Sequence, residues 1–327
     1  MSFTWSRMGR WSNNVWRSLT IAAAVAAGLA GVAQEQRGRP DDFDRLQYAV
    51  VNGVKLAYRA EGRGIPVVFV HGESHTHELW SRQIDAVRSQ YMFVSYDRRG
   101  HGQSEAPVTG YSPLANAEDL NGLVGFLRLA DAHFVVNSRG GAVILQFLRL
   151  YPQKVRSIVF ADATIALAAL SDTFQAAVRR YSAPPLSLDE ALRQREARKR
   201  SSFYAVANTR PDVKAVLDRM IDQYSPRVAM NPRQALDQVS PMDIGPWNER
   251  DFPDMVRLAK PVLLVVAEKT DSYFVDGARK ASLAWPGARM ETISGADHLL
   301  ALEAPDVFNP LILDFFAAVD AAPKQRR

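Results

Sequence analysis

The stretch FVVNSRGGAVILQFLRLYP, residues 134–152, decides the fold. It begins as an apolar strand that ends near Val136, passes through Ser138, and opens a helix at Gly140 and Gly141 whose apolar residues recur at helical spacing. A sharp turn from strand to helix around a serine lifts the hydroxyl out of the sheet and points the helix N-terminus at it. We therefore predict that Ser138 is a nucleophile presented on such a turn.

Short, nearly continuous apolar runs flank this turn on both sides. Such runs are typical of strands buried on both faces of a parallel sheet. Helical patterns at 116–129 and 140–151 alternate with them, and this order predicts a doubly wound α/β sheet. An antiparallel strand pair precedes the sheet, because apolar and polar residues alternate through residues 48–60 around a turn at Asn52 and Gly53. The predicted buried strands cover residues 66–70, 91–96, 133–136, 155–160 and 262–266.

One long segment between two predicted strands has no strand pattern. Residues 164–259 contain amphipathic helical patterns interrupted by prolines, which predicts a helical cap inserted over one edge of the sheet. The basic run at 193–200 lies in this cap, and we interpret it as a solvated helix face. The chain then divides into a leader at 1–33, sheet-domain parts at 34–163 and 260–327, and the cap between them.

Four stretches together resemble the α/β-hydrolase family. The turn at Ser138 resembles its GxSxG elbow, with Val136 in place of the first glycine. VFVHGES at 68–74 resembles its HG oxyanion loop, YDRRGHGQSEAP at 96–107 its DxRGxGxS loop, and ISGADHLLALEAP at 293–305 the loop that carries its histidine. The resemblance implies an α/β-hydrolase fold, with a mostly parallel doubly wound sheet and an inserted helical cap, over nearly the whole chain after the leader.

The same resemblance implies a catalytic triad. Ser138 would be the nucleophile, His298 the base that takes its proton, and Asp271 the acid that orients the imidazole. The family usually has the acid one residue earlier, where this chain has Thr270, so Asp162 after the preceding strand is the alternative acid. We prefer Asp271 because it keeps the chain order serine, aspartate, histidine.

The resemblance also assigns an oxyanion hole to the backbone N–H groups of Glu73 and Arg139. This chemistry requires no cofactor. His71, His75 and His77 lie close together, but Ser81 stands where an HExxH motif beginning at His77 would need its second histidine, so no metal site is predicted.

The function implied is hydrolysis of an ester or lactone of a small carboxylic acid, with a small-molecule substrate as the partner. Carbon–carbon bond hydrolysis and haloperoxidase-like perhydrolysis are alternatives on the same fold. A non-catalytic ligand-binding relative is the alternative of a different class, because Val136 and Thr270 depart from the family's pattern. An epoxide hydrolase or dehalogenase is disfavoured, because it would need an aspartate where Ser138 stands.

Composition and charge bear on compartment and partners. The 327 residues include no cysteine, which excludes disulfides, thiolate zinc sites and cysteine nucleophiles. Three arginines precede the uncharged run at 19–33, which is shorter than the ~20 residues of a membrane span. We therefore predict an export signal and a periplasmic or secreted protein without a stable membrane span, with an N-terminal membrane anchor as the alternative.

The basic charge belongs mainly to this leader. Its removal changes 40 basic and 35 acidic residues to 37 and 35, so the formal net charge falls from +5 to +2. A nucleic-acid partner is therefore not predicted.

Overall fold

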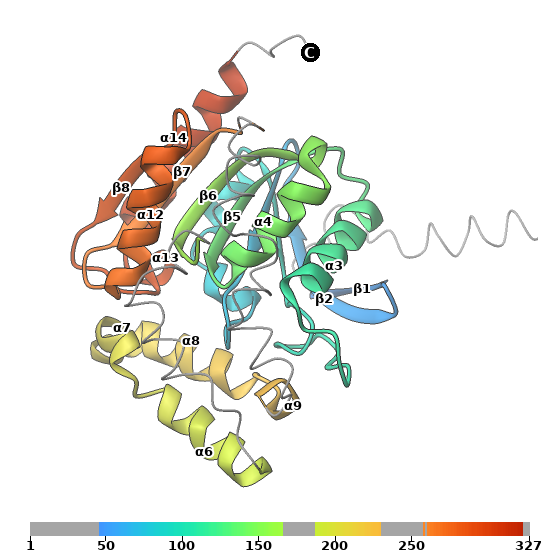
Figure 1. The fold of residues 1–327 in the computed structure, drawn as a ribbon, viewed down its shortest axis with the longest axis vertical. Coiled ribbons are helices and arrows are strands. Elements are labelled where there is room, and N and C mark those ends of the chain that lie inside the picture. Colours follow the sequence, from blue (N-terminus) through green and yellow to red (C-terminus); the bar gives the residue numbers. More distant parts are fainter. Residues whose placement is uncertain (1–45, 166–186, 230–257, 259, 323–327) are drawn as a thin grey trace, which may run out of the picture. The chain divides into compact units, whose positions relative to one another are not determined.

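The computed structural model describes residues 46–165, 187–229, 258 and 260–322, which are built around an eight-stranded sheet (Figure 1). The strand order is β1-β2-β4-β3-β5-β6-β7-β8. β2 pairs antiparallel with β1 and β4, and every other neighbouring pair is parallel, as the sequence predicts. The strands are β1 (Gln47–Val51), β2 (Val54–Glu61), β3 (Pro66–Val70), β4 (Met92–Tyr96), β5 (Ala132–Ser138), β6 (Val155–Ala163), β7 (Val262–Ala267) and β8 (Arg289–Ile293).

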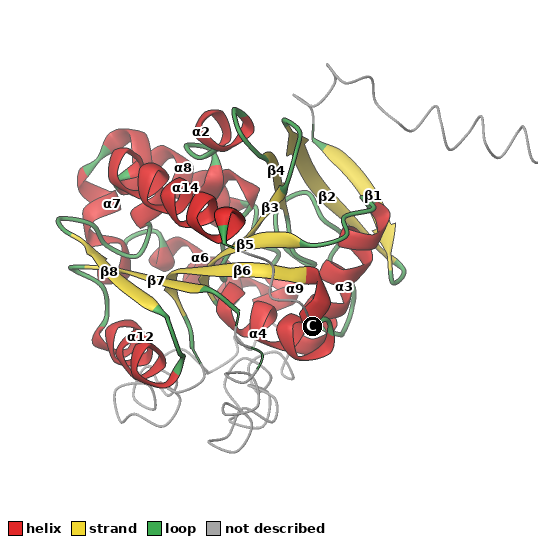
Figure 2. Ribbon diagram, turned by 90° about the horizontal axis from the view of Figure 1, so that it is seen from above, coloured by secondary structure: helices red, strands yellow, loops and turns green. Residues whose placement is uncertain are grey.

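Helices cover both faces of the sheet. Figure 2 shows α3 (Pro113–Phe126), α4 (Gly140–Leu150) and α12 (Ser272–Ala284) on one face, with α2 (Ile84–Arg88) and α14 (Pro305–Ala321) on the other. Every residue of β5 and β7 is consequently buried. β7 is wholly apolar, as is typical of a strand covered on both faces, whereas β5 also carries His133 and ends in Asn137 and Ser138. The short helix α13 (Leu300–Glu303) precedes α14.

The expected cap is described in part. Between β6 and β7 the structure describes α6 (Leu188–Arg198), η4 (Ser202–Tyr204), α7 (Ala205–Thr209), α8 (Pro211–Asp222) and α9 (Pro226–Ala229). The remaining cap residues 166–186, 230–257 and 259, together with the predicted leader at 1–33, lie outside the described residues.

Helix α8 fixes the described part of the cap to the sheet domain. Its buried residues are spaced so that they form one apolar stripe, which belongs to the same core cluster as Leu79 and Trp80 of η1 (His77–Trp80). An ion pair between Arg219 and Glu78, at 2.9 Å, joins the same two elements. The buried residues of the stripe are Val213, Leu217, Met220 and Ile221.

Parallel pairing brings the carboxyl ends of β3, β5, β6 and β7 to one edge of the sheet, and polar residues gather there. Among the described residues, none of the helices combines the length and the apolar character that crossing a bilayer requires.

Candidate active site

Ser138 occupies a strained turn at the carboxyl end of β5. Its backbone φ is +50°, in the left-handed region that residues with a side chain seldom adopt. Helix α4 begins at Gly140, so the helix N-terminus lies beside the serine. A Cβ on Gly141 would lie 2.1 Å from the Thr164 carbonyl oxygen, so this close approach requires glycine. The strand, turn and helix that the sequence predicts around Ser138 are present, with Val136 buried in the strand.

The structure places Asp162, the alternative acid, beside His298. The Nδ1 atom of His298 and the Oδ2 atom of Asp162 are 2.6 Å apart, and both side chains are buried. The preferred acid, Asp271, is instead exposed at the residue that precedes α12. The physical reason lies in the topology, because β6 is the neighbour of β5 and its carboxyl end meets the Ser138 turn directly.

Two further donors fix the Asp162 carboxylate. The Thr270 hydroxyl donates to Oδ2 at 2.6 Å, and the Ala267 backbone N–H donates to Oδ1 at 3.3 Å. A buried charge needs such partners to offset its lost hydration. Because a carboxylate only accepts hydrogen bonds, the proton of a neutral His298 lies on Nδ1, which leaves Nε2 as a base.

Aromatic rings hold the His298 imidazole in place. The Phe203 ring of η4 lies 4.2 Å away, centroid to centroid, and the Phe274 ring of α12 stacks at 4.8 Å. The Nε2 atom is buried and has no hydrogen-bond partner within the described ranges. His298 and Ser138 line the same pocket, so the unpaired ring nitrogen and the serine share one site.

The loop after β3 approaches Ser138 very closely. A Cβ on Gly72 would lie 2.5 Å from Cβ of Ser138, so this position also requires glycine. The Gly72 carbonyl accepts hydrogen bonds from Nδ1 of His71 at 2.7 Å and from Nη2 of Arg98 at 3.0 Å. The N–H of the same peptide unit belongs to Glu73 and points the opposite way, because the peptide is trans. Two donors therefore fix the direction of the Glu73 N–H.

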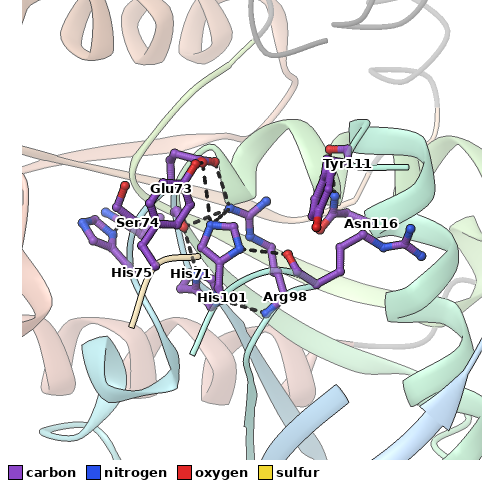
Figure 3. Close-up of polar contacts among 12 residues, drawn as sticks. His71, Glu73, Ser74, His75, Arg98, His101, Tyr111 and Asn116 are labelled. Carbon is purple, nitrogen blue, oxygen red and sulfur yellow. Dashed lines mark hydrogen bonds and ion pairs between the residues drawn. The ribbon is translucent and has the colours of Figure 1, made fainter. Parts of the chain in front are cut away.

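His71 can act in this way because it is neutral. Burial and the nearby Arg98 charge lower the pKa of His71 well below its ordinary value. The neutral ring donates at Nδ1 and accepts the backbone N–H of Arg98 at Nε2, with a distance of 2.9 Å. Figure 3 shows His71, Arg98 and His101 gathered around Glu73.

The Glu73 side chain is part of the same network. Burial acts to raise the pKa of its carboxyl, but the hydrogen bond from His101 and the charges of His101, Arg98 and Arg139 bring that pKa well below its ordinary value. The carboxylate accepts the Tyr224 hydroxyl and lies 3.4 Å from Nη2 of Arg98. Glu73 is therefore an ionised group that binds core and cap residues, beyond the backbone role expected of it.

Asn137, which directly precedes the serine, is a site residue that the sequence reasoning missed. Its amide donates to the carbonyl oxygens of Ala161 and His298, at 3.0 and 3.2 Å, and so ties the histidine loop to β6. Its Oδ1 atom lies 3.2 Å from Nδ1 of His75, whose Nε2 lies 3.1 Å from the Tyr204 hydroxyl. A polar residue at the buried end of an apolar strand was the available signal.

The pocket over Ser138 and His298 is partly open to solvent and has a cavity volume of about 110 Å³. Glu73, Arg139 and Arg198 contribute charged groups to its lining. Its aromatic lining residues are Phe203, Tyr204 and Tyr273. Within the described ranges no group of three or more histidine, aspartate or glutamate side chains is placed to hold a metal ion.

Residues 67–311 match a family described as the alpha/beta hydrolase family, a span that covers most of the chain. The chain belongs to the alpha/beta hydrolase family. Both the resemblance and the fold class inferred from the sequence are thereby confirmed.

Known proteins similar to this alpha/beta hydrolase act on several kinds of substrate. A non-heme chloroperoxidase from Streptomyces lividans is 29% identical over 278 residues, covering 81% of this chain and 96% of that protein. The solved structure of Est816, described as an N-acyl homoserine lactone degrading enzyme, matches with a TM-score of 0.65 and 25% identity over 82% of this chain and 100% of that one. The esterase EaEST from Exiguobacterium antarcticum matches with a TM-score of 0.70 over 84% of this chain and 99% of that one, and at 19% identity this likeness shows the fold alone.

The basic run at 193–200 of this alpha/beta hydrolase divides between solvent and site. Arg193 and Arg200 are exposed, as expected of a solvated helix face. Lys199 pairs with Asp222 at 2.6 Å. Arg198 instead lines the pocket that contains Ser138, a position that the run of basic residues did not reveal.

Proposed function

We propose that this protein is a serine hydrolase that cleaves an ester or lactone of a small carboxylic acid, with Ser138, His298 and Asp162 as its triad. The observation that carries the proposal is the 2.6 Å contact between His298 and Asp162, with the unpaired Nε2 atom in the same pocket as Ser138. A carboxylate, an imidazole and a hydroxyl in this order are the groups that activate a serine.

The chemistry proceeds in two halves. His298 takes the Ser138 proton as the hydroxyl oxygen attacks the substrate carbonyl, and it then gives that proton to the leaving alcohol oxygen. The acyl group is now an ester of Ser138. A water molecule, deprotonated by His298, attacks this ester, and the departing serine oxygen recovers the proton. Asp162 stabilises the imidazolium in both halves and stays ionised.

The negative oxygen formed in each half needs hydrogen-bond donors. The backbone N–H groups of Glu73 and Arg139 are assigned this role. Arg139 is the N-cap of α4, so its N–H lies at the positive end of a helix. The Glu73 N–H is fixed in direction by the two bonds to the Gly72 carbonyl. Each such donor is worth about 10²- to 10³-fold in rate.

The experiment uses 4-nitrophenyl butyrate together with a fluorophosphonate probe. We expect hydrolysis that falls at least about 10³-fold in Ser138→Ala, and a probe adduct on the peptide that contains Ser138. Ser282→Ala, at a half-buried position of α12 outside the described pocket lining, is the control and should behave as the wild-type protein does. A folded protein that neither hydrolyses the ester nor forms the adduct would favour the non-catalytic ligand-binding alternative.

Perhydrolysis is a second candidate, favoured by the likeness to the chloroperoxidase. Hydrogen peroxide would replace water in the attack on the acyl ester of Ser138 and release a peracid, which then oxidises a halide ion. Bromination of monochlorodimedone in acetate buffer with peroxide and bromide tests this activity. It should be lost in Ser138→Ala, whereas bromination that persists in this variant would exclude the acyl-enzyme route.

We also propose that residues 1–33 direct export and are removed. The basic start and the short uncharged run support this. N-terminal sequencing of the protein from the producing cell should begin near Gln34, and an intact Met1 or Ser2 would contradict it.

A further inference from the structure

We propose that the substrate carries a carboxylate in addition to its scissile bond, and that Arg198 binds this carboxylate. The inference rests on the proposed ester or lactone hydrolysis and names the class of substrate. It comes from the position of a single cap residue, which is the last residue of α6.

Arg198 is held in a fixed place at the pocket. Its Nη1 atom donates to the Ser74 hydroxyl, and its guanidinium carbon lies 5.7 Å from the centre of the Tyr224 ring. A cation–π contact with an aromatic ring and one hydrogen bond leave other N–H groups of the guanidinium for a ligand, since arginine carries five donors in a rigid fork. An arginine held in this way loses little conformational freedom when an anion arrives.

The part of the pocket lining that the structure describes carries more cationic than anionic side chains. Among its described lining residues, two guanidinium groups, those of Arg139 and Arg198, face one carboxylate, that of Glu73. This carboxylate already has the Arg98 guanidinium at 3.4 Å and the Tyr224 hydroxyl as partners. Among the described residues Arg198 forms no ion pair with a carboxylate, so an anionic ligand would be bound more favourably there than a neutral one.

The pocket brings side chains from the sheet domain and the cap to one cavity. Ser138 and His298 belong to the sheet domain, whereas Arg198 belongs to the cap, and all three line one cavity. A carboxylate bound by Arg198 would orient an acyl chain whose carbonyl lies at the serine. Half-esters of short dicarboxylic acids, and lactones that carry a carboxylate, have this arrangement.

The test compares two esters that differ in one charge. Mono-(4-nitrophenyl) glutarate ends in a carboxylate, and methyl 4-nitrophenyl glutarate has the same chain with the charge masked. We expect kcat/KM to be at least about tenfold higher for the charged ester, a preference expressed in KM because the carboxylate is remote from the reacting bond. In Arg198→Gln the ratio of the two kcat/KM values should fall about 10- to 100-fold.

Matched variants separate charge recognition from a general effect on the cap. Arg193→Gln removes the same charge from the exposed side of the same helix and should keep the preference. Arg198→Lys keeps the positive charge but loses the planar guanidinium, and it should keep part of the preference for the charged ester. This variant still tests the proposal if Arg198→Gln does not fold. Equal hydrolysis of both esters by the wild-type protein, or a preference that Arg198→Gln does not reduce, would overturn the inference while leaving the serine hydrolase standing.

Binding supplies a readout that does not need turnover. Titration calorimetry of Ser138→Ala with glutarate should show binding, and the double variant that also carries Arg198→Gln should show none. If neither ester is hydrolysed in a Ser138-dependent way, the proposed function fails, and this titration alone decides the inference. Absence of glutarate binding to Ser138→Ala would then overturn it.

Discussion

Thr270 donates its hydroxyl to Asp162 across 2.6 Å, at the same carboxylate oxygen that contacts His298. Thr270 stands where the family usually has the acid of the triad. Thr270, in the loop after β7, thus binds a carboxylate that comes from the end of β6.

This arrangement predicts opposite results for the two candidate acids. Asp162→Asn should lower kcat about 10⁴-fold, because an amide can donate to Nδ1 and so favours the wrong tautomer of His298. Asp271→Asn should leave kcat within about twofold, because its side chain is exposed and has no contact with the histidine. The kcat of both variants is measured by ester hydrolysis at pH 8. A larger loss in Asp271→Asn than in Asp162→Asn would identify Asp271, in the loop after β7, as the acid.

The sequence could not choose between these carboxylates for a physical reason. Asp162 lies at the carboxyl end of β6 and Asp271 in the loop after β7, and both strands end at the same edge of the sheet, so spacing alone makes either carboxylate available. The choice depends on side-chain direction. Asp162 has a φ of +48°, which points its carboxylate toward His298, and residue type alone does not reveal such a conformation.

Arg98 is predicted to position the oxyanion peptide. In Arg98→Met the Gly72 carbonyl loses one of its two donors, and His71 alone holds the direction of the Glu73 N–H. We expect kcat to fall about 10- to 100-fold with KM within about threefold, because the N–H acts mainly on the transition state. The affinity of a boronic acid that forms a tetrahedral adduct should fall in parallel.

The control for this change is Arg63→Met, which removes a charge from an exposed loop position. It should match the wild-type protein in kcat and in boronic acid affinity. If Arg98→Met raised KM while leaving kcat and the boronic acid affinity unchanged, Arg98 would act on substrate binding and the positioning role would be wrong.

A pair of glycine substitutions tests the elbow. Gly141→Ala would place a methyl group 2.1 Å from the Thr164 carbonyl, so the helix and β6 must separate, at a cost of about 1–3 kcal/mol of unfolding free energy. Gly125→Ala, in α3 with open space around it, should be neutral or stabilise by up to about 1 kcal/mol. Urea denaturation measures the unfolding free energy of both variants. Equal stability would show that the close approach at Gly141 does not require glycine.

Much of the fold follows from local sequence. The expected strands at 66–70, 91–96 and 155–160 match β3, β4 and the first part of β6. Short, continuous apolar runs predict such strands well, because helices bury both faces of this sheet. The expectation stopped short at Phe160, since the last residues of β6 include Asp162, and a buried carboxylate is not part of a strand pattern. Hydropathy patterns therefore do not predict the polar residues at strand ends, which are the residues that form the site.

Glu303 gives the fold a pH dependence of definite sign. Burial raises the pKa of its carboxyl from 4.5 to about 7, so the folded protein holds this proton more tightly than the unfolded chain does. The contribution of this group to stability is present below about pH 4.5 and is lost as the pH rises through about 7, by on the order of 3 kcal/mol. Urea midpoints at pH 5 and pH 8 measure this loss.

Glu303→Gln should abolish most of that difference, because the amide does not titrate. Glu291→Gln is the control, since Glu291 is half-exposed on β8 and its removal should leave the difference between the two midpoints as it is. A wild-type protein that is more stable at pH 8 than at pH 5 by the full amount would contradict the assignment to Glu303.

The packing of Phe203 on His298, at 4.2 Å between ring centres, has a consequence for engineering. Phe203 lies in the cap, so the part of the chain that would be exchanged to alter specificity also packs on His298, the proposed base. A chimera that takes its cap from another hydrolase would lose this ring contact and the bond from Tyr204 to His75 together. Transplanted caps would therefore have to keep an aromatic pair at positions 203 and 204, and directed evolution of new specificities would start more safely from α6 than from η4.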